Sequence, residues 1–70
     1  MIKKGILKGF DPQGYKAVVQ MEGSQKAYLE AIHTAWNIPA SAMITGRTVV
    51  VACFSGDNMY DAVIIAVYSP

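Results

Sequence analysis

Two apolar runs near the C-terminal end, residues 49–54 and 62–68, constrain the fold of this chain most. β-branched residues are frequent in both runs, and the polar stretch SGDNMYD (55–61) separates them. This pattern predicts a strand over 47–54, a connecting loop, and a final strand over 62–69. Neither run alternates with polar residues, so each predicted strand has two apolar faces. The interior of a small fold covers only one of them.

The length of 70 residues predicts one domain, 1–70, with a marginal core. A chain of this size buries only about 60% of the surface that its unfolded form exposes. Small folds therefore often add a disulfide, a metal ion or a second subunit. Cys53 is the single cysteine and His33 the single histidine, which excludes an internal disulfide and a four-ligand Cys/His zinc site. Of these supports, oligomerisation remains open.

Turn residues divide the first half of the chain. Pro12 and Gly14 lie in FDPQGY (10–15), where proline presets its own φ and glycine accepts a positive φ. The flanking segments then form a hairpin, with strands over roughly 3–10 and 15–21. One face of the second strand carries Tyr15, Ala17, Val19 and Met21.

The segment 24–36, SQKAYLEAIHTAW, fits two structures. As a helix it has a cap at Ser24 and an apolar stripe, and local propensity favours this interpretation. As a strand its alternation is poorer. Pro39 disfavours a helical conformation at Ile38, and residues 39–43 predict one short helical turn before a bend at Gly46.

Several short strands with glycine and proline between them predict an all-β fold. The economical arrangement is a small five-stranded barrel, OB-like or SH3-like, with at most one short helical turn. Barrel closure hides sheet edges that would otherwise promote aggregation.

The residues do not assemble an evident catalytic or metal-binding set. Cys53 lies in an apolar strand, where a thiol is usually inert. Glu30 and His33 would share a face only on a helix. Asp57, Asn58 and Asp61 carry oxygen ligands for a hard cation, but an ordinary turn explains them more simply. We therefore expect a non-enzyme without cofactor or bound metal.

The overall charge bears on partners and location. Six basic and five acidic residues give a net charge of +1, which does not by itself predict nucleic-acid binding. Small barrels do bind single strands through basic and aromatic residues, and this alternative would use Lys4, Lys8, Tyr15 and Lys16. The chain has neither an apolar run of about 20 residues nor a secretory signal. We expect a cytoplasmic protein without membrane contact.

The segment ITGRTVVVACFSGDNMYDAVIIAVYSP (44–70) resembles the closing hairpin of the OB-fold module in phage tail spike, baseplate-hub and type VI secretion spike proteins. The whole chain also resembles short stand-alone bacterial and prophage-type proteins with the layout KGILKGFD, YKAVVQMEGS, YLEAI and IPASAMITGR. The resemblance departs from the spike pattern at Met59–Asp61, and the chain lacks a fibrous needle. It implies a strand over much of 27–35 and a phage-particle location as the alternative.

These observations predict a structural or assembly module that self-associates or docks in a larger complex. The uncovered faces of the two C-terminal strands are the predicted interface. It comprises Val50, Ala52, Phe54, Val63, Ile65 and Val67.

Overall fold

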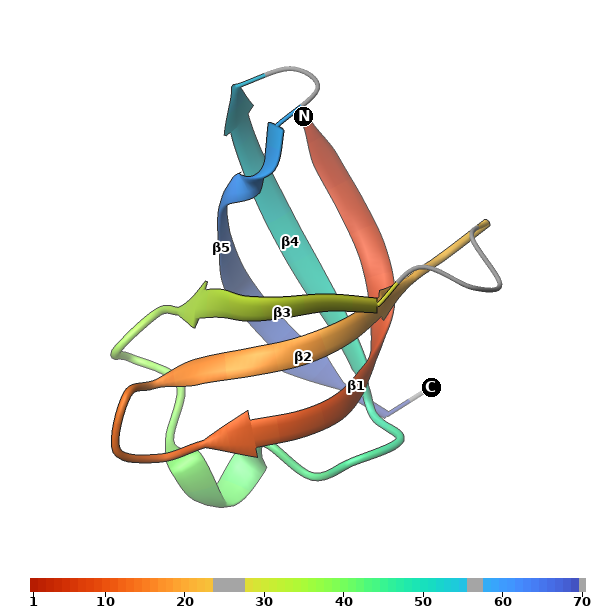
Figure 1. Cartoon of the computed structure of the whole chain (residues 1–70). Coiled ribbons are helices and arrows are strands. Elements are labelled where there is room, and N and C mark those ends of the chain that lie inside the picture. Colours follow the sequence, from red (N-terminus) through yellow and green to blue (C-terminus); the bar gives the residue numbers. More distant parts are fainter. Residues whose placement is uncertain (24–27, 56–57, 70) are drawn as a thin grey trace.

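Five strands and one 3-10 turn wrap into a closed barrel (Figure 1). This computed structural model describes residues 1–23, 28–55 and 58–69, with the backbone alone described at 55 and 58–60. The elements in chain order are β1 (Ile2–Asp11), β2 (Lys16–Met21), β3 (Tyr28–Thr34), η1 (Ala40–Ala42), β4 (Thr48–Ser55) and β5 (Asn58–Tyr68).

The strands follow the order β1-β2-β3-β5-β4 around the barrel, and β4 pairs again with β1. All neighbouring pairs are antiparallel except β3 and β5, which are parallel over a short stretch. The predicted all-β, five-stranded barrel with one short helical turn is therefore confirmed. The short helical turn lies between β3 and β4.

The interior is filled by alternate residues of the strands. Fully buried side chains come from every strand, and the largest are Leu7, Val19, Ile32, Val49, Val51 and Ile64. Of the four residues predicted on one face of the second strand, Ala17, Val19 and Met21 are buried in β2, whereas Tyr15 precedes the strand and is half-buried. Alternation places one side chain in two inside the barrel, as strand geometry requires.

Part of the segment 24–36, whose sequence fits either a helix or a strand, forms a strand. β3 spans Tyr28–Thr34, and its Ile32 and His33 pair with Ala17 and Lys16 of β2. Ile32 is buried in the core. Local helix propensity is weak compared with the barrel contacts that this segment gains as a strand. The strand interpretation is therefore confirmed over Tyr28–Thr34.

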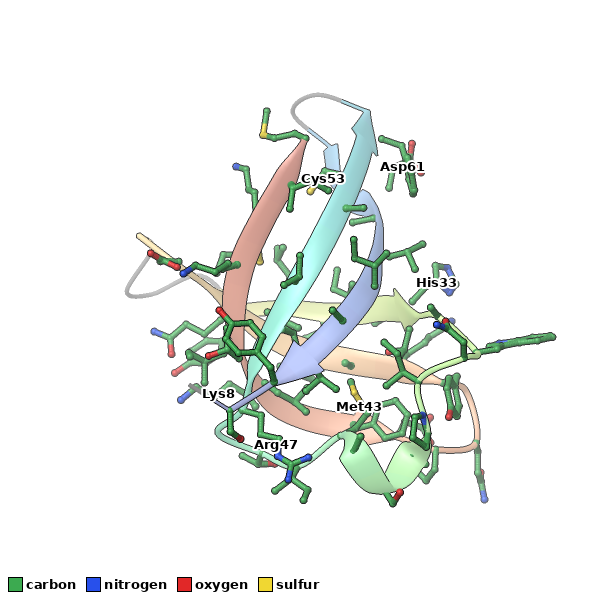
Figure 2. All side chains as sticks on the ribbon, turned by 180° about the vertical axis from the view of Figure 1, so that it is seen from behind. Lys8, His33, Met43, Arg47, Cys53 and Asp61 are labelled. Atoms are coloured by element: carbon green, nitrogen blue, oxygen red, sulfur yellow. The ribbon has the colours of Figure 1, made fainter. Side chains whose placement is uncertain are left out.

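The connection between β3 and β4 closes one end of the barrel. Ile38 and Met43 are buried there, on either side of η1. The Arg47 guanidinium donates a 2.9 Å hydrogen bond to the carbonyl oxygen of Ala42, which ties η1 to the start of β4. Figure 2 shows Met43 and Arg47 at this end of the molecule. The helical turn predicted over 39–43 is thus present as η1.

Bulges interrupt the ladders where single residues have no opposite partner. The register between β1 and β2 shifts at Lys8, that between β2 and β3 shifts next to Ala31, and that between β4 and β5 shifts at Ile65. Ala31 has φ of 60°, a left-handed conformation that single residues at bulges adopt. Beyond each bulge the inward and outward faces of the strand are exchanged.

The last strand is longer than predicted. β5 begins at Asn58, which pairs with Ser55, so the predicted loop over 55–61 is mostly strand. The register between Cys53 and Ser55 is irregular, because β5 contributes more residues than β4 there. The turn-forming residues therefore indicated where the chain passes from β4 to β5, but the loop predicted from them was too long.

Gly5 is, together with Ile6, a residue at which β1 belongs to two ladders. It pairs with Met21 of β2 on one side and with Val49 of β4 on the other. A Cβ atom at Gly5 would lie 2.5 Å from Cγ1 of Val19 and 2.9 Å from the carbonyl oxygen of Gln20. Only a residue without a side chain allows β1 to cross β2 this closely.

We predict that Gly5→Ala lowers the free energy of unfolding by about 2 kcal/mol or more, because the new methyl group has no space. Urea unfolding followed by circular dichroism measures this loss. Gly9→Ala is the matched control, because a Cβ there meets Val18 atoms at 3.8 and 3.9 Å, an ordinary contact. We expect the control to change stability by no more than about 0.5 kcal/mol. Equal losses in both variants would contradict the close approach at Gly5.

Candidate interaction surfaces

One side of the barrel is an apolar wall formed by the outward residues of β1, β4 and β5. Three rows cross these strands in register. The rows are Ile2–Ala52–Val63, Lys4–Val50–Ala66 and Ile6–Thr48–Tyr68. We call this surface, together with the outward Phe54 and the bulged Ile65, the outer wall.

The outer wall exposes large apolar side chains. Phe54 is 67% and Ile2 62% exposed, and Ile6, Ile65 and Tyr68 are exposed to a smaller extent. Val50, Ala52 and Val63 are half-buried between them. Scattered apolar residues are normal on a protein surface, but a contiguous patch marks a surface that contacts another molecule.

The structure corrects the predicted interface at its C-terminal end. Val67 pairs with the buried Val49 and packs against the core, so its assignment to the outer face is wrong. Ala66 and Tyr68, which regular alternation places inside, lie on the outer wall instead. The bulge at Ile65 causes this exchange, because one extra residue reverses every later side chain of the strand. The other five predicted residues lie on the outer wall.

Sequence reasoning missed the contribution of β1 to this surface. Ile2 and Ile6 lie on the outer wall because β1 pairs with β4, which is more than 40 residues away along the chain. The alternation of Ile2, Lys4 and Ile6 was the available signal, but it does not show which strand lies next to β1. The one charged residue in the three rows, Lys4, is 3.9 Å from the Glu22 carboxylate at the edge of the wall.

The residues of the predicted nucleic-acid face do not form one cluster. Lys16 pairs with His33 on the outer side of β2 and β3, whereas Lys4 lies on the outer wall beside Glu22. Figure 2 shows Lys8 and His33 at opposite sides of the molecule. The exposed aromatic residue on the β2–β3 side is Tyr28, which pairs with Gln20.

Tyr15 has a structural environment. Its ring meets that of Phe10 edge to face, with 5.1 Å between centroids. Its hydroxyl donates to the carbonyl oxygen of Ile38, and its own carbonyl oxygen accepts a 2.9 Å hydrogen bond from the Thr34 amide. Tyr15 therefore joins the β1–β2 turn to the segment after β3.

Cys53 and His33, both weighed for catalysis, lie in different parts of the molecule (Figure 2). Cys53 is buried in the core and His33 is exposed (Figure 2). In the part of the chain that the structure describes, no group of three or more His, Cys, Asp or Glu side chains is placed to hold a metal ion. Asp57 lies outside the described residues, and Asp61 is at the exposed side of β5. Within the described ranges, no helix has the length and apolar character needed to cross a membrane.

Comparison with known proteins adds no relative to this description. No model of a known protein family matches the chain, and no curated protein matches it.

We predict that Tyr15→Phe lowers the free energy of unfolding by about 1 kcal/mol, because the part-buried Ile38 carbonyl loses its donor. Tyr28→Phe is the matched control, since the Tyr28 side chain is exposed, and we expect no change beyond about 0.5 kcal/mol. Thermal unfolding of both variants beside the parent checks the difference. If Tyr28→Phe lowers the free energy of unfolding as much as Tyr15→Phe does, the hydrogen bond from the Tyr15 hydroxyl to Ile38 makes no specific contribution to stability.

Proposed function

We propose that this protein is a non-enzymatic assembly module, and that it self-associates through the outer wall. The observation that carries this proposal is the continuity of apolar rows across three neighbouring strands. Five large apolar side chains of the wall are exposed at once, which is unfavourable for a free surface and favourable for a contact.

A second copy of the chain is the partner that the wall suits best. Both ends of the wall are apolar, with Ile2 and Phe54 near one end and Ile6 and Tyr68 at the other. A two-fold axis through its middle therefore brings apolar residues against apolar residues, as a self-complementary interface requires. Lys4, in the middle row, has its ammonium group near Glu22, and a lysine stem adds apolar contact while its charge stays in water.

The size of the molecule is consistent with this partner. The accessible surface of the chain is 4354 Å², and a standard interface covers about 800 Å² of each partner, a little under one fifth of that surface. A wall made of three of the five strands can supply such an area. Association also adds buried apolar surface to a domain whose own core is small.

The resemblance of residues 44–70 to phage and secretion spike modules supports an assembly role as well. In those proteins an OB-fold module is one part of a larger particle. By this analogy the present chain is a phage-derived or phage-like building block, located in the cytoplasm or in the particle.

Single-strand nucleic-acid binding is the alternative function, and it has less support. Its four predicted residues are divided between different surfaces, and the Tyr15 ring packs on Phe10. Lys16 shares its side of the sheet with the acidic residues Asp11 and Glu30, so local charge is nearly balanced.

We predict that the double variant Phe54→Ser, Ile65→Thr weakens self-association at least about tenfold, because both side chains lose apolar area in the contact. Both residues are exposed in the monomer, so the fold is retained. Sedimentation velocity over a range of micromolar concentrations measures the association. Ile44→Ser is the control, because Ile44 is 50% exposed and lies outside the outer wall.

A parent protein that sediments at 7.6 kDa at all concentrations would overturn the proposal. Equal weakening by Ile44→Ser and by the double variant would also count against the outer wall.

A further inference from the structure

The most exposed large apolar side chain of the described residues is not on the outer wall. Trp36 is 90% exposed and lies just after β3. Tryptophan is the residue most enriched among the energetic anchors of protein interfaces. Because Trp36 is not part of the outer wall, self-association through that wall does not explain why its side chain is almost completely exposed.

The backbone beside Trp36 is held firmly. Trp36 lies in a turn closed by a 3.1 Å hydrogen bond from the Ile38 amide to the Ala35 carbonyl oxygen. The Ala35 amide donates to the carbonyl oxygen of Ile64 in β5, and the Ile38 carbonyl oxygen accepts from the Tyr15 hydroxyl. Both ends of the turn are thus fixed to the barrel, so little backbone entropy is lost when Trp36 enters a contact.

An apolar hollow of about 400 Å³ lies on the outer side of β1, β2 and β3. Gly9, Val18 and Ala31 lie next to one another across these strands, and Phe10 and Ala17 add to the lining. The bulges at Lys8 and Ala31 flank this place, and small residues at Gly9 and Ala31 leave the space empty. The hollow is an open depression on the surface with a mainly apolar lining, so an aromatic side chain of another molecule can pack against it.

The hollow and the Trp36 turn belong to the same part of the barrel, the β2–β3 pair and the residues that follow it. Lys16 lines the hollow and pairs with His33, which is three residues before Trp36. The chain therefore carries an exposed apolar projection and an apolar recess on the same part of the barrel. Two copies related by a two-fold axis can each insert the projection into the recess of the other, which makes a closed and reciprocal contact.

We propose that Trp36 of one copy inserts into the hollow of a second copy, as a contact additional to the outer wall. This inference rests on the proposed self-association and gives it a second, specific contact. The polar groups at the recess suit an indole ring. The Asp11 carboxylate can accept the indole N–H, and the Lys16 ammonium can lie over the ring face.

A second copy fits these residues better than a nucleic acid does. The recess has one acidic and one basic side chain, so its lining carries no net positive charge to attract phosphates. The recess can take an apolar side chain, and Trp36 is an apolar side chain held on a fixed turn. Both features belong to this chain, so a second copy supplies the contact for each.

The experiment follows the intrinsic fluorescence of Trp36, the single tryptophan of the chain, as protein concentration rises. We expect a shift of the emission to shorter wavelength and reduced quenching by acrylamide, in step with the mass increase seen by sedimentation. Gly9→Val narrows the recess, and the Cβ that it adds has only ordinary contacts with Val18. We expect this variant to keep the emission of an exposed tryptophan and to associate about tenfold more weakly.

Trp36→Ala should weaken association to a similar degree, while Ile44→Ala, which removes an exposed side chain elsewhere, should leave both association and emission unchanged. Circular dichroism confirms the fold of each variant.

Other outcomes separate this contact from the outer wall. If the protein associates while the Trp36 emission stays that of an exposed residue, the Trp36 contact is overturned and the outer wall stands. If Gly9→Val and Trp36→Ala weaken association but Phe54→Ser, Ile65→Thr does not, the outer wall is overturned and the Trp36 contact stands. An emission shift caused by an added single-stranded oligonucleotide at low salt, without any effect of protein concentration, overturns the second copy as the occupant.

Discussion

The close passage of β1 over β2 at Gly5 is the constraint on which this barrel depends. At Gly5 and Ile6 the strand pairs with β4 on one side and with β2 on the other. Val19 and the Gln20 backbone occupy the space where a side chain of Gly5 would be. Because β1 serves both ladders, a sheet of five strands closes and buries an interior. Closure determines which strands are neighbours, and therefore which outward side chains share a surface.

Closure also explains why a chain with so many apolar residues has apolar surfaces left over. The interior accepts one side chain in two from each strand, and the runs in β4 and β5 are apolar at nearly every position. The remainder gathers on the outer wall, where Ile2 and Ile6 of β1 extend it. The Trp36 turn and the hollow beside Val18 are a second pair of unsatisfied apolar features. Both features are the surfaces on which the proposed self-association rests.

Bulges decide which residues reach those surfaces. The bulge at Lys8 lets Phe10 pack against the core, and the bulge at Ile65 moves Val67 inward and Tyr68 outward. The unpaired residue at Ala31 helps to form the hollow. In each case one extra residue in a ladder reverses the faces beyond it. The irregular positions of this small sheet are therefore the ones that shape its outer features.

The sequence by itself determined the all-β class, the strands of the hairpins, the turn before β4 and five of the six predicted outer residues, because alternation and turn chemistry are local properties. It left the segment of β3 undecided, because helix propensity there competes with pairing to β2. Only the tertiary structure decided the addition of Ile2 and Ile6 to the outer wall, the exchange of Val67 for Tyr68, and the exposure of Trp36. These features depend on register and on pairing between distant segments, and a one-residue shift in register, invisible in the local pattern, moves a side chain from one face to the other.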